Sequence, residues 1–149
     1  NQMNVESNSQ IYSSRIIHAP IEKVYEAFAN PLHLKNWWGP YGFTNTIHEF
    51  DLQPGGKWIL TMHGPKVGNY ENSSIFTEVS PHRLVAWKRL SQPLFDMEVG
   101  FEKIDGVHTQ ISFRMIFESP DACDKIKKFA LPKNEENFDR LVLELESIL

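Results

Sequence analysis

From residue 95 to residue 119 the chain alternates between apolar and polar residues on both sides of one tight turn. The two runs read FDMEVGFEKI and VHTQISFRMIFES, and Asp105-Gly106 between them is a typical hairpin turn. A period of two sends neighbouring side chains to opposite faces of a strand. The segment therefore predicts an antiparallel hairpin with one apolar face. The residues expected on that face are Met97, Val99, Phe101, Ile111, Phe113, Met115 and Phe117.

Strand-like composition continues on the N-terminal side of this hairpin. Residues 57–64, KWILTMHG, alternate Trp58, Leu60 and Met62 with polar residues, so one face of this strand is also expected to be apolar. Further strands are indicated by the runs at 46–53, 69–80 and 83–90, each bounded by turn residues, and by QIYSSRIIH at 10–18. Six of these strands follow one another closely, which is typical of an antiparallel meander.

Helical signals occur in two places. Residues 19–31, APIEKVYEAFANP, have apolar residues at helical spacing and stop at Asn-Pro, and residues 32–38 are expected to add one more turn. In the tail, Ser119 is a predicted N-cap. Leu131-Pro132 is expected to interrupt the tail, with Asn134 capping a second, longer helix. The apolar stripe expected on that helix comprises Phe138, Leu141, Val142, Leu145, Ile148 and Leu149.

This order of elements predicts an α+β fold. One strand and two short helices precede a curved antiparallel meander, and a long C-terminal helix covers the apolar face of the sheet. At 149 residues, one domain spanning residues 10–149 is expected. The polar residues 1–9 are expected to lie outside it, either disordered or left over from protein production.

Composition excludes several classes of function. The net charge is −4 and the basic residues form no stripe, so a nucleic-acid partner is not expected. No stretch is apolar enough to enter a membrane, and the single Cys123 suits a reducing compartment, which favours a cytoplasmic location. A reactive Cys123 and an inert one both fit this pattern. The six histidines are scattered, so no metal and no cofactor are expected.

Two adjacent tryptophans, Trp37 and Trp38, stand directly before Gly39-Pro40. Neighbouring residues cannot both face one core from a regular strand, and on a helix they lie about 100° apart. Each indole N–H also needs a hydrogen-bond acceptor, which a rim supplies more readily than a closed core. We therefore expect one indole in the core and the other at the mouth of an apolar interior, where it and Phe43 form a gate.

Four segments, taken in order, resemble one protein family. They are HAPIEKVYEAFANPLHLKNWWGP at 18–40, FDLQPGGKW at 50–58, TMHGPKVGNY at 61–70 and EVSPHRLV at 78–85. The sequence is similar, over residues 13–149, to helix-grip proteins of the START/SRPBCC superfamily. Within it the chain resembles the branch named after homologues of the activator of heat-shock protein 90 ATPase. The resemblance implies a curved sheet that grips the C-terminal helix, with a hydrophobic cavity between them.

Trp87 departs from the pattern of the resembled family. Such proteins tend to read RLVFTW where this chain reads RLVAWKR, so the aromatic residue comes one position early. A shift of one residue moves a side chain to the other face of a strand. Either a bulge corrects the shift, or Ala86 leaves room inside while Trp87 faces elsewhere.

The resemblance favours non-catalytic binding of a small hydrophobic molecule, such as a lipid, a polyketide or an aromatic metabolite. The alternative is that these side chains simply fill the core. The residues expected to line the cavity are Trp37, Trp38, Phe43, Trp58, Leu60, Met62, Trp87, Met97, Phe101, Met115, Phe117, Phe129 and Phe138.

Two other functions remain open. The family name implies a co-chaperone that binds a chaperone through the acidic outer face of Asp96, Glu98 and Glu102. An enzyme of cyclase or hydrolase type would use the same cavity, with Asp51 as a base or with His63 and Tyr70 polarising a carbonyl. The sequence does not indicate an oligomeric state.

Overall fold

The computed structural model describes residues 7–148, which form one antiparallel sheet and three α-helices. The sheet has seven strands in the order β1-β7-β6-β5-β4-β3-β2. The elements are η2 Ser7–Ser9, β1 Gln10–Ile17, α1 Ile21–Ala29, α2 Pro31–Trp37, β2 Thr44–Phe50, β3 Lys57–His63, β4 Asn69–Ser80, β5 Leu84–Arg89, β6 Asp96–Asp105, β7 His108–Ile116 and α3 Pro120–Ile148. The predicted α+β helix-grip fold is confirmed.

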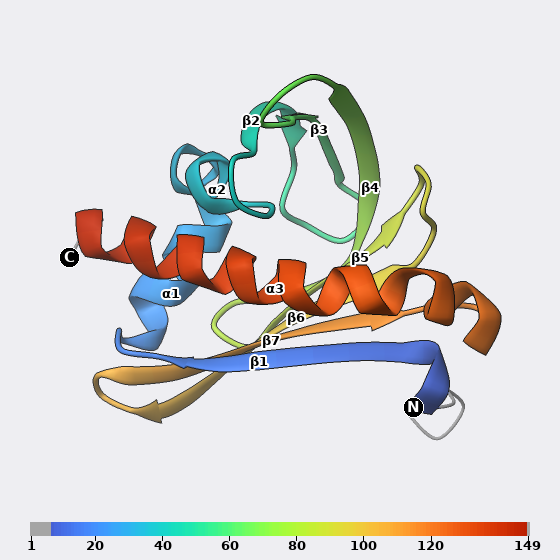
Figure 1. The fold of residues 1–149 in the computed structure, drawn as a ribbon. Coiled ribbons are helices and arrows are strands. Elements are labelled where there is room, and N and C mark those ends of the chain that lie inside the picture. The colour runs from blue at the N-terminus through green and yellow to red at the C-terminus, as the bar shows by residue number, and fades with distance from the viewer. Residues whose placement is uncertain (1–6, 149) are drawn as a thin grey trace.

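Helix α3 crosses the width of the molecule in front of the sheet, with α1 and α2 near its C-terminal half (Figure 1). Phe138, Leu141 and Leu145 recur at helical spacing on α3 and are at most 2% exposed. The ring of Phe138 lies 4.6 Å from that of Phe113 on β7, measured between centroids. Helix α3 therefore packs on the inner face of the sheet, as the apolar stripe predicts. Helix α1 packs there too, with the ring of Tyr25 5.2 Å from that of Phe101 on β6.

The predicted hairpin forms from β6 and β7. Met97 is opposite Met115, Val99 is opposite Phe113, and Phe101 is opposite Ile111. All six side chains are buried. Cross-strand pairs of this kind are the units that stabilise a sheet, and here they supply the centre of its inner face.

Trp87 lies beside a bulge in the neighbouring strand β4. Phe76 is paired with Trp87 and Glu78 with Ala86, so Thr77 is an extra residue without a partner on β5. On the other side of β5, Trp87 is opposite Met97 and Val85 is opposite Val99. Trp87 is 3% exposed and lies on the inner face. The pairing of β5 with β6 is regular from Leu84 to Lys88, so Trp87 faces inward by alternation with Val85. The alternative in which Trp87 faces elsewhere is wrong.

The description of the chain begins at η2, where Ser9 is buried and its carbonyl accepts a hydrogen bond from the Phe117 N–H. Leu149, expected on the apolar stripe of the tail, lies outside the described residues, as do residues 1–6.

The predicted break at Leu131-Pro132 is wrong, because α3 continues through Pro132. A proline removes one N–H donor from the helix, and burial of the apolar stripe offsets that loss. Asn134 therefore caps no helix, and its Nδ2 donates to Ser13 Oγ on β1 at 3.2 Å. The predicted N-cap at Ser119 is confirmed, since its Oγ accepts from the Ala122 N–H. No helix within residues 7–148 is long and apolar enough to cross a membrane.

The contact between α3 and the sheet can be tested with two leucines of the same helix. Leu141 is fully buried and Leu143 is 65% exposed. We expect Leu141→Ala to lower the free energy of unfolding by about 3 kcal/mol, because it leaves a cavity under the helix. The control Leu143→Ala should change it by less than about 0.5 kcal/mol. Urea denaturation measures both, and equal effects would contradict this account of α3.

Candidate functional site

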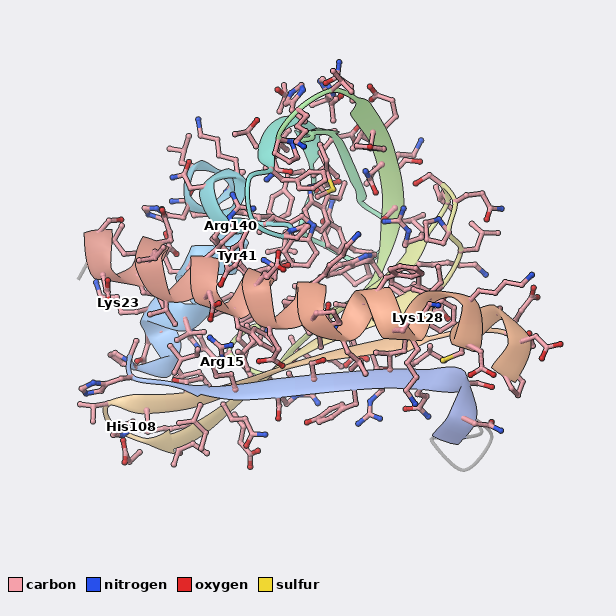
Figure 2. The ribbon with its side chains drawn as sticks, in the orientation of Figure 1. Arg15, Lys23, Tyr41, His108, Lys128 and Arg140 are labelled. Carbon is pink, nitrogen blue, oxygen red and sulfur yellow. The ribbon has the colours of Figure 1, made fainter. Side chains whose placement is uncertain are left out.

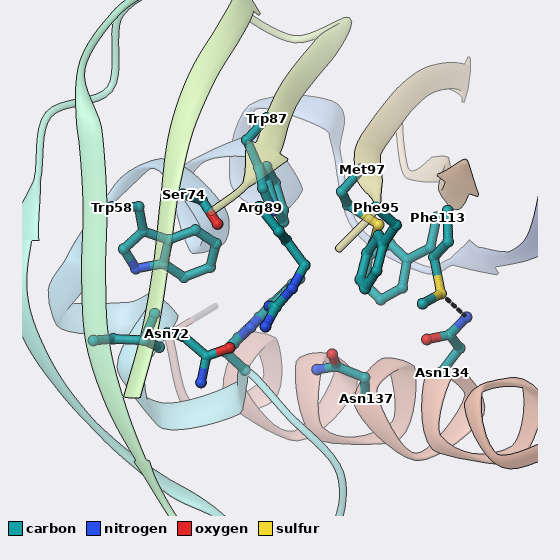
Figure 3. Close-up of a pocket in the computed structure, with 13 residues that line it drawn as sticks. Trp58, Asn72, Ser74, Trp87, Arg89, Phe95, Met97, Phe113, Asn134 and Asn137 are labelled. Atoms are coloured by element: carbon teal, nitrogen blue, oxygen red, sulfur yellow. Dashed lines mark hydrogen bonds between the residues drawn. The ribbon is translucent and has the colours of Figure 1, made fainter. Parts of the chain in front are cut away.

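A pocket of about 110 Å³ lies between the inner face of the sheet and α3 (Figure 3). We call it the interior pocket. Aromatic and methionine side chains make most of its wall, and all of its polar lining except one residue is uncharged. The lining consists of Trp38, Trp58, Leu60, Asn72, Ser74, Trp87, Arg89, Phe95, Met97, Phe113, Met115, Asn134 and Asn137.

The two adjacent tryptophans have different environments because α2 ends between them. Trp37 is the last residue of α2, is fully buried, and donates its Nε1–H to the Ala27 carbonyl at 2.8 Å. Trp38 is the C-cap, with φ −70° and ψ 132°. Its ring lies 5.3 Å from that of Trp58 and 5.7 Å from that of Trp87, and it lines the interior pocket.

Arg140 of α3 holds the segment that carries Trp38. Its Nη1 donates to the carbonyl oxygens of Trp38, Gly39 and Pro40, at 2.9, 2.9 and 3.0 Å. Its Nη2 donates to those of Asn36 and Phe43, at 3.0 and 2.8 Å. Burial lowers the pKa of Arg140, yet an arginine stays protonated at neutral pH. We call residues 36–43 the tryptophan segment and Arg140 its clamp.

A second set of contacts holds the same segment to α3. The Tyr41 hydroxyl donates to Asp139, and the Tyr41 N–H donates to Glu136 Oε1 at 2.9 Å. Asp139 also pairs with Arg15 of β1, at 2.6 Å. The hydrogen bonds from Tyr41 and Arg15 lower the pKa of Asp139. Arg140, Tyr41 and Arg15 thus gather around α3 and connect the tryptophan segment to the sheet (Figure 2).

The polar wall of the interior pocket comes from β4, β5 and α3. Asn137 is 5% exposed and donates its Nδ2–H to the Trp37 carbonyl at 2.7 Å. Arg89, at the end of β5, is the only charged residue in the lining. Its Nε donates to the Pro93 carbonyl at 2.8 Å, and its guanidinium carbon lies 5.2 Å from the centroid of the Phe95 ring. Burial lowers the pKa of Arg89.

Trp58 carries a polar atom without a partner. Its side chain is 2% exposed, and its Nε1 makes no hydrogen bond with any residue in the described part of the chain. A buried indole N–H usually has an acceptor, and leaving a buried donor unpaired costs about 1–3 kcal/mol. Trp58 therefore gives the aromatic wall an unused donor.

An open groove of about 620 Å³ adjoins the interior pocket, and we call it the outer groove. The two share Asn72, Arg89 and Phe95 as a common wall. The rest of its lining is Pro40, Phe43, Met62, Asn69, Tyr70, Glu71, Gln92, Pro93 and Lys133. Since Arg89 and Phe95 belong to both, they separate the interior pocket from the more open space outside.

The structure brings together six of the thirteen residues expected to line a cavity. Trp38, Trp58, Leu60, Trp87, Met97 and Met115 line the interior pocket. Phe43 and Met62 line the outer groove instead, so Phe43 does not meet Trp38 in one gate around the interior pocket.

The remaining five do not line the interior pocket. Trp37, Phe101, Phe117 and Phe138 are at most 5% exposed and belong to the surrounding core. Phe129 is 55% exposed, because it lies on the side of α3 that is turned away from the sheet, where Lys128 Nζ lies 5.3 Å from its ring. Its expected place in the cavity is corrected.

Sequence reasoning missed the polar residues of the site. Arg89, Asn134, Asn137 and the clamp Arg140 were not among the candidates. The local sequence pattern around an asparagine or an arginine is the same whether the residue faces solvent or lines a pocket. The weak signal that was available is the position of Asn137 and Arg140 next to Phe138 and Leu141, within the apolar stripe.

The catalytic candidates lie outside the interior pocket. His63 lies within hydrogen-bond distance of Thr46 Oγ1 and Asn69 Oδ1, at 2.8 and 2.7 Å. Tyr70 is 53% exposed in the outer groove, and Asp51 accepts a hydrogen bond from Gln53. Within residues 7–148, no three His, Cys, Asp or Glu side chains gather closely enough to hold a metal ion.

The family described as Activator of Hsp90 ATPase homolog 1-like protein matches residues 18–149. The chain belongs to this family. The matched range therefore includes the tryptophan segment, the whole lining of the interior pocket and α3. No curated protein sequence matches the chain.

Solved structures with the same fold come from several bacteria. A protein from Nitrosomonas europaea has a TM-score of 0.87 at 16% identity, over 97% of this chain and 99% of that one. A protein from Rhodobacter sphaeroides has a TM-score of 0.86 at 19% identity, over 96% of each chain. The AHSA1 protein from Silicibacter pomeroyi has a TM-score of 0.77 at 16% identity, over 94% and 99%. At these identities the likeness extends to the fold alone.

The clamp can be tested by removing the guanidinium of Arg140. We expect Arg140→Gln to lower the free energy of unfolding by about 2–4 kcal/mol, since charge-assisted hydrogen bonds to backbone carbonyls are lost. Hydrogen exchange in residues 36–43 should also become faster. The control Lys125→Gln removes the same charge from an exposed position of α3 and should change neither quantity. Slow exchange in residues 36–43 of Arg140→Gln would contradict the clamp.

Proposed function

We propose that this protein binds a small, largely aromatic molecule in the interior pocket and does not transform it. The observation that supports this most is the composition of the lining. Three indole rings, two phenyl rings and two methionines surround a space that a few polar groups also line, and among these the Trp58 Nε1–H has no partner within the described residues. Ligand sites are usually of this kind, with an apolar wall and a few polar atoms that fix orientation.

The size of the interior pocket limits what fits. A cavity of about 150 Å³ lined by apolar residues accommodates benzene, whereas drug-sized ligands need about 300–1,000 Å³. At about 110 Å³ the interior pocket suits a body of roughly one ring. A lipid or polyketide would have to extend past Arg89 and Phe95 into the outer groove, or displace the flexible side chains of Met97 and Met115.

The lining favours binding over catalysis. Arg89 is the only ionisable side chain that lines the interior pocket, and an arginine does not act as a general base at neutral pH. His63 and Asp51 lie outside that lining. An enzyme of cyclase or hydrolase type would need a base within hydrogen-bond reach of its substrate. Cys123 is buried and is the single cysteine of the sequence, which suits the cytoplasmic location that we propose.

A chaperone partner is the second candidate, and the name of the family supports it. Of the acidic residues expected to serve it, Glu98 has an oxygen 3.5 Å from the guanidinium of Arg114, which reduces its charge toward a partner. Asp96 and Glu102 are exposed on β6. Binding of a heat-shock ATPase through these residues should weaken as salt is raised. Titration with the chaperone of the same host tests this candidate independently of the pocket.

The four tryptophans provide a test of the proposed ligand site. We expect benzyl alcohol, a neutral one-ring probe, to cause saturable NMR shifts of the indole N–H signals of Trp38, Trp58 and Trp87, which line the interior pocket. The signal of Trp37 should move little, because its Nε1–H is bonded to the Ala27 carbonyl in the core.

Two substitutions on β4, one that fills the interior pocket and one that does not, serve as matched variants for this test. Ser74 lines the interior pocket, whereas Ser73 is the next residue on β4 and does not. Ser74→Leu should abolish the saturable shifts by occupying the space, and Ser73→Leu should leave them. If wild-type protein shows no saturable shift, or if Ser74→Leu binds as well as Ser73→Leu, binding in this pocket is refuted.

A further inference from the structure

Arg89 differs from the other arginines in its partners. Arg15, Arg83 and Arg114 each lie within 4.0 Å of a carboxylate oxygen. Arg140 has both of its terminal nitrogens on backbone carbonyls. Arg89 is not in contact with any carboxylate of residues 7–148. Its acceptors are all neutral, and they belong to the loop of residues 90–95.

Part of the Arg89 guanidinium is unused. Its Nε donates to the Pro93 carbonyl, and its Nη2 donates to the Gln92 carbonyl at 3.2 Å and to Ser91 Oγ at 3.3 Å. The Nη1 atom carries two further N–H groups. Neither has an acceptor in the part of the chain that the structure describes. The loop contacts fix the orientation of the guanidinium, so its free edge is held in place before any ligand arrives.

The location of this free edge is the second observation. Arg89 lines the interior pocket and also the outer groove, and Figure 3 shows its side chain extending from β5 toward α3. Burial lowers the pKa of Arg89, which means that its charge is poorly solvated. A buried charge without a counter-charge is costly, and here the lining supplies no negative group.

We infer that the ligand of the interior pocket carries a carboxylate that pairs with Nη1 of Arg89. This inference rests on the proposed ligand binding and specifies its chemistry. The ring of the ligand lies among the indoles of the interior pocket, and its carboxylate lies at the wall shared with the outer groove. The ligand class is a small arylcarboxylic acid.

The neighbouring charges agree with an anionic ligand. Besides Arg89, the charged residues lining the outer groove are Lys133 and Glu71. Glu71 accepts a hydrogen bond from Thr61 Oγ1 at 2.8 Å. Two positive groups and one negative group leave the mouth of the pocket with an excess of positive charge. The unpartnered Nε1–H of Trp58 gives the same pocket a further donor for an oxygen of the ligand.

The experiment compares benzoate with benzyl alcohol, which has a similar ring and no charge. In wild-type protein, NMR titration should give a dissociation constant for benzoate at least about ten-fold lower than for benzyl alcohol, because charge-assisted hydrogen bonds are the stronger kind. In Arg89→Met the preference for benzoate should disappear. Lys88→Met is the control, since it removes the same charge from the adjacent, exposed residue of β5 and should keep the preference.

The outcomes separate this inference from the proposed function. Equal affinities for benzoate and benzyl alcohol in wild-type protein would overturn the inference and leave ligand binding in place. The same holds if Lys88→Met loses the preference as fully as Arg89→Met does. Absence of saturable binding by both probes would overturn the inference together with the proposed function. The wild-type comparison decides the matter even if Arg89→Met disturbs the loop of residues 90–95.

Discussion

The structure depends on the cover that α3 provides for the inner face of a curved sheet. A sheet with one apolar face has to bury it, and here α3 covers a large part of it through Phe138, Leu141 and Leu145. Phe28 of α1 covers Trp58 and Trp87 beside it. A straight helix cannot touch every point of a curved surface. Large side chains from β3, β5 and α2 extend into the remaining space. The interior pocket is what these side chains leave unfilled.

Aromatic rings explain why such a space persists. Rings are rigid and meet edge to face, as Trp58 and Trp87 do at 85°, so they cannot adapt to every gap as aliphatic chains can. Phe28 is fully buried and its ring is stacked on that of Trp87, with 5.7 Å between the centroids. At the wall shared with the outer groove, Asn72 and Arg89 stand beside the ring of Phe95, so polar and aromatic side chains meet there.

Local patterns in the sequence were enough to predict the sheet. The alternation around Asp105-Gly106 and the apolar spacing of the tail each depend on neighbours in the chain, and both agree with the structure. The orientation of Trp87 was not decidable, because it follows from the pairing of β5 with β6, which the residues around Trp87 do not specify. The break predicted at Pro132 was wrong for a similar reason, since the packing that maintains α3 comes from elements distant in the sequence.

The candidate site was predictable only in its apolar half. Trp58, Leu60, Met97 and Met115 reach the interior pocket because strand alternation places them on the inner face. Asn137 is positioned by the Trp37 carbonyl, 100 residues away in the chain, and no periodicity identifies such a partner. Arg89 makes its hydrogen bonds within the loop of residues 90–95, but the pocket that it lines is formed by other strands and by α3. Phe129 was expected in the cavity and is exposed instead, because helical spacing does not show where the buried face of a helix ends.

The clamp of Arg140 has a consequence for how this family can diversify. Its five acceptors are all main-chain oxygens, and every amino acid provides one. Exchange of a side chain between Trp38 and Phe43 therefore leaves these five hydrogen bonds in place, although replacing Tyr41 would remove its contact with Asp139. Gly39 and Gly42 are constrained, because their φ values of 99° and 84° and the nearby side chains of Met62 and Pro65 exclude a β-carbon. Substitutions in this segment can therefore change the side chains near the pocket while its backbone stays attached to α3.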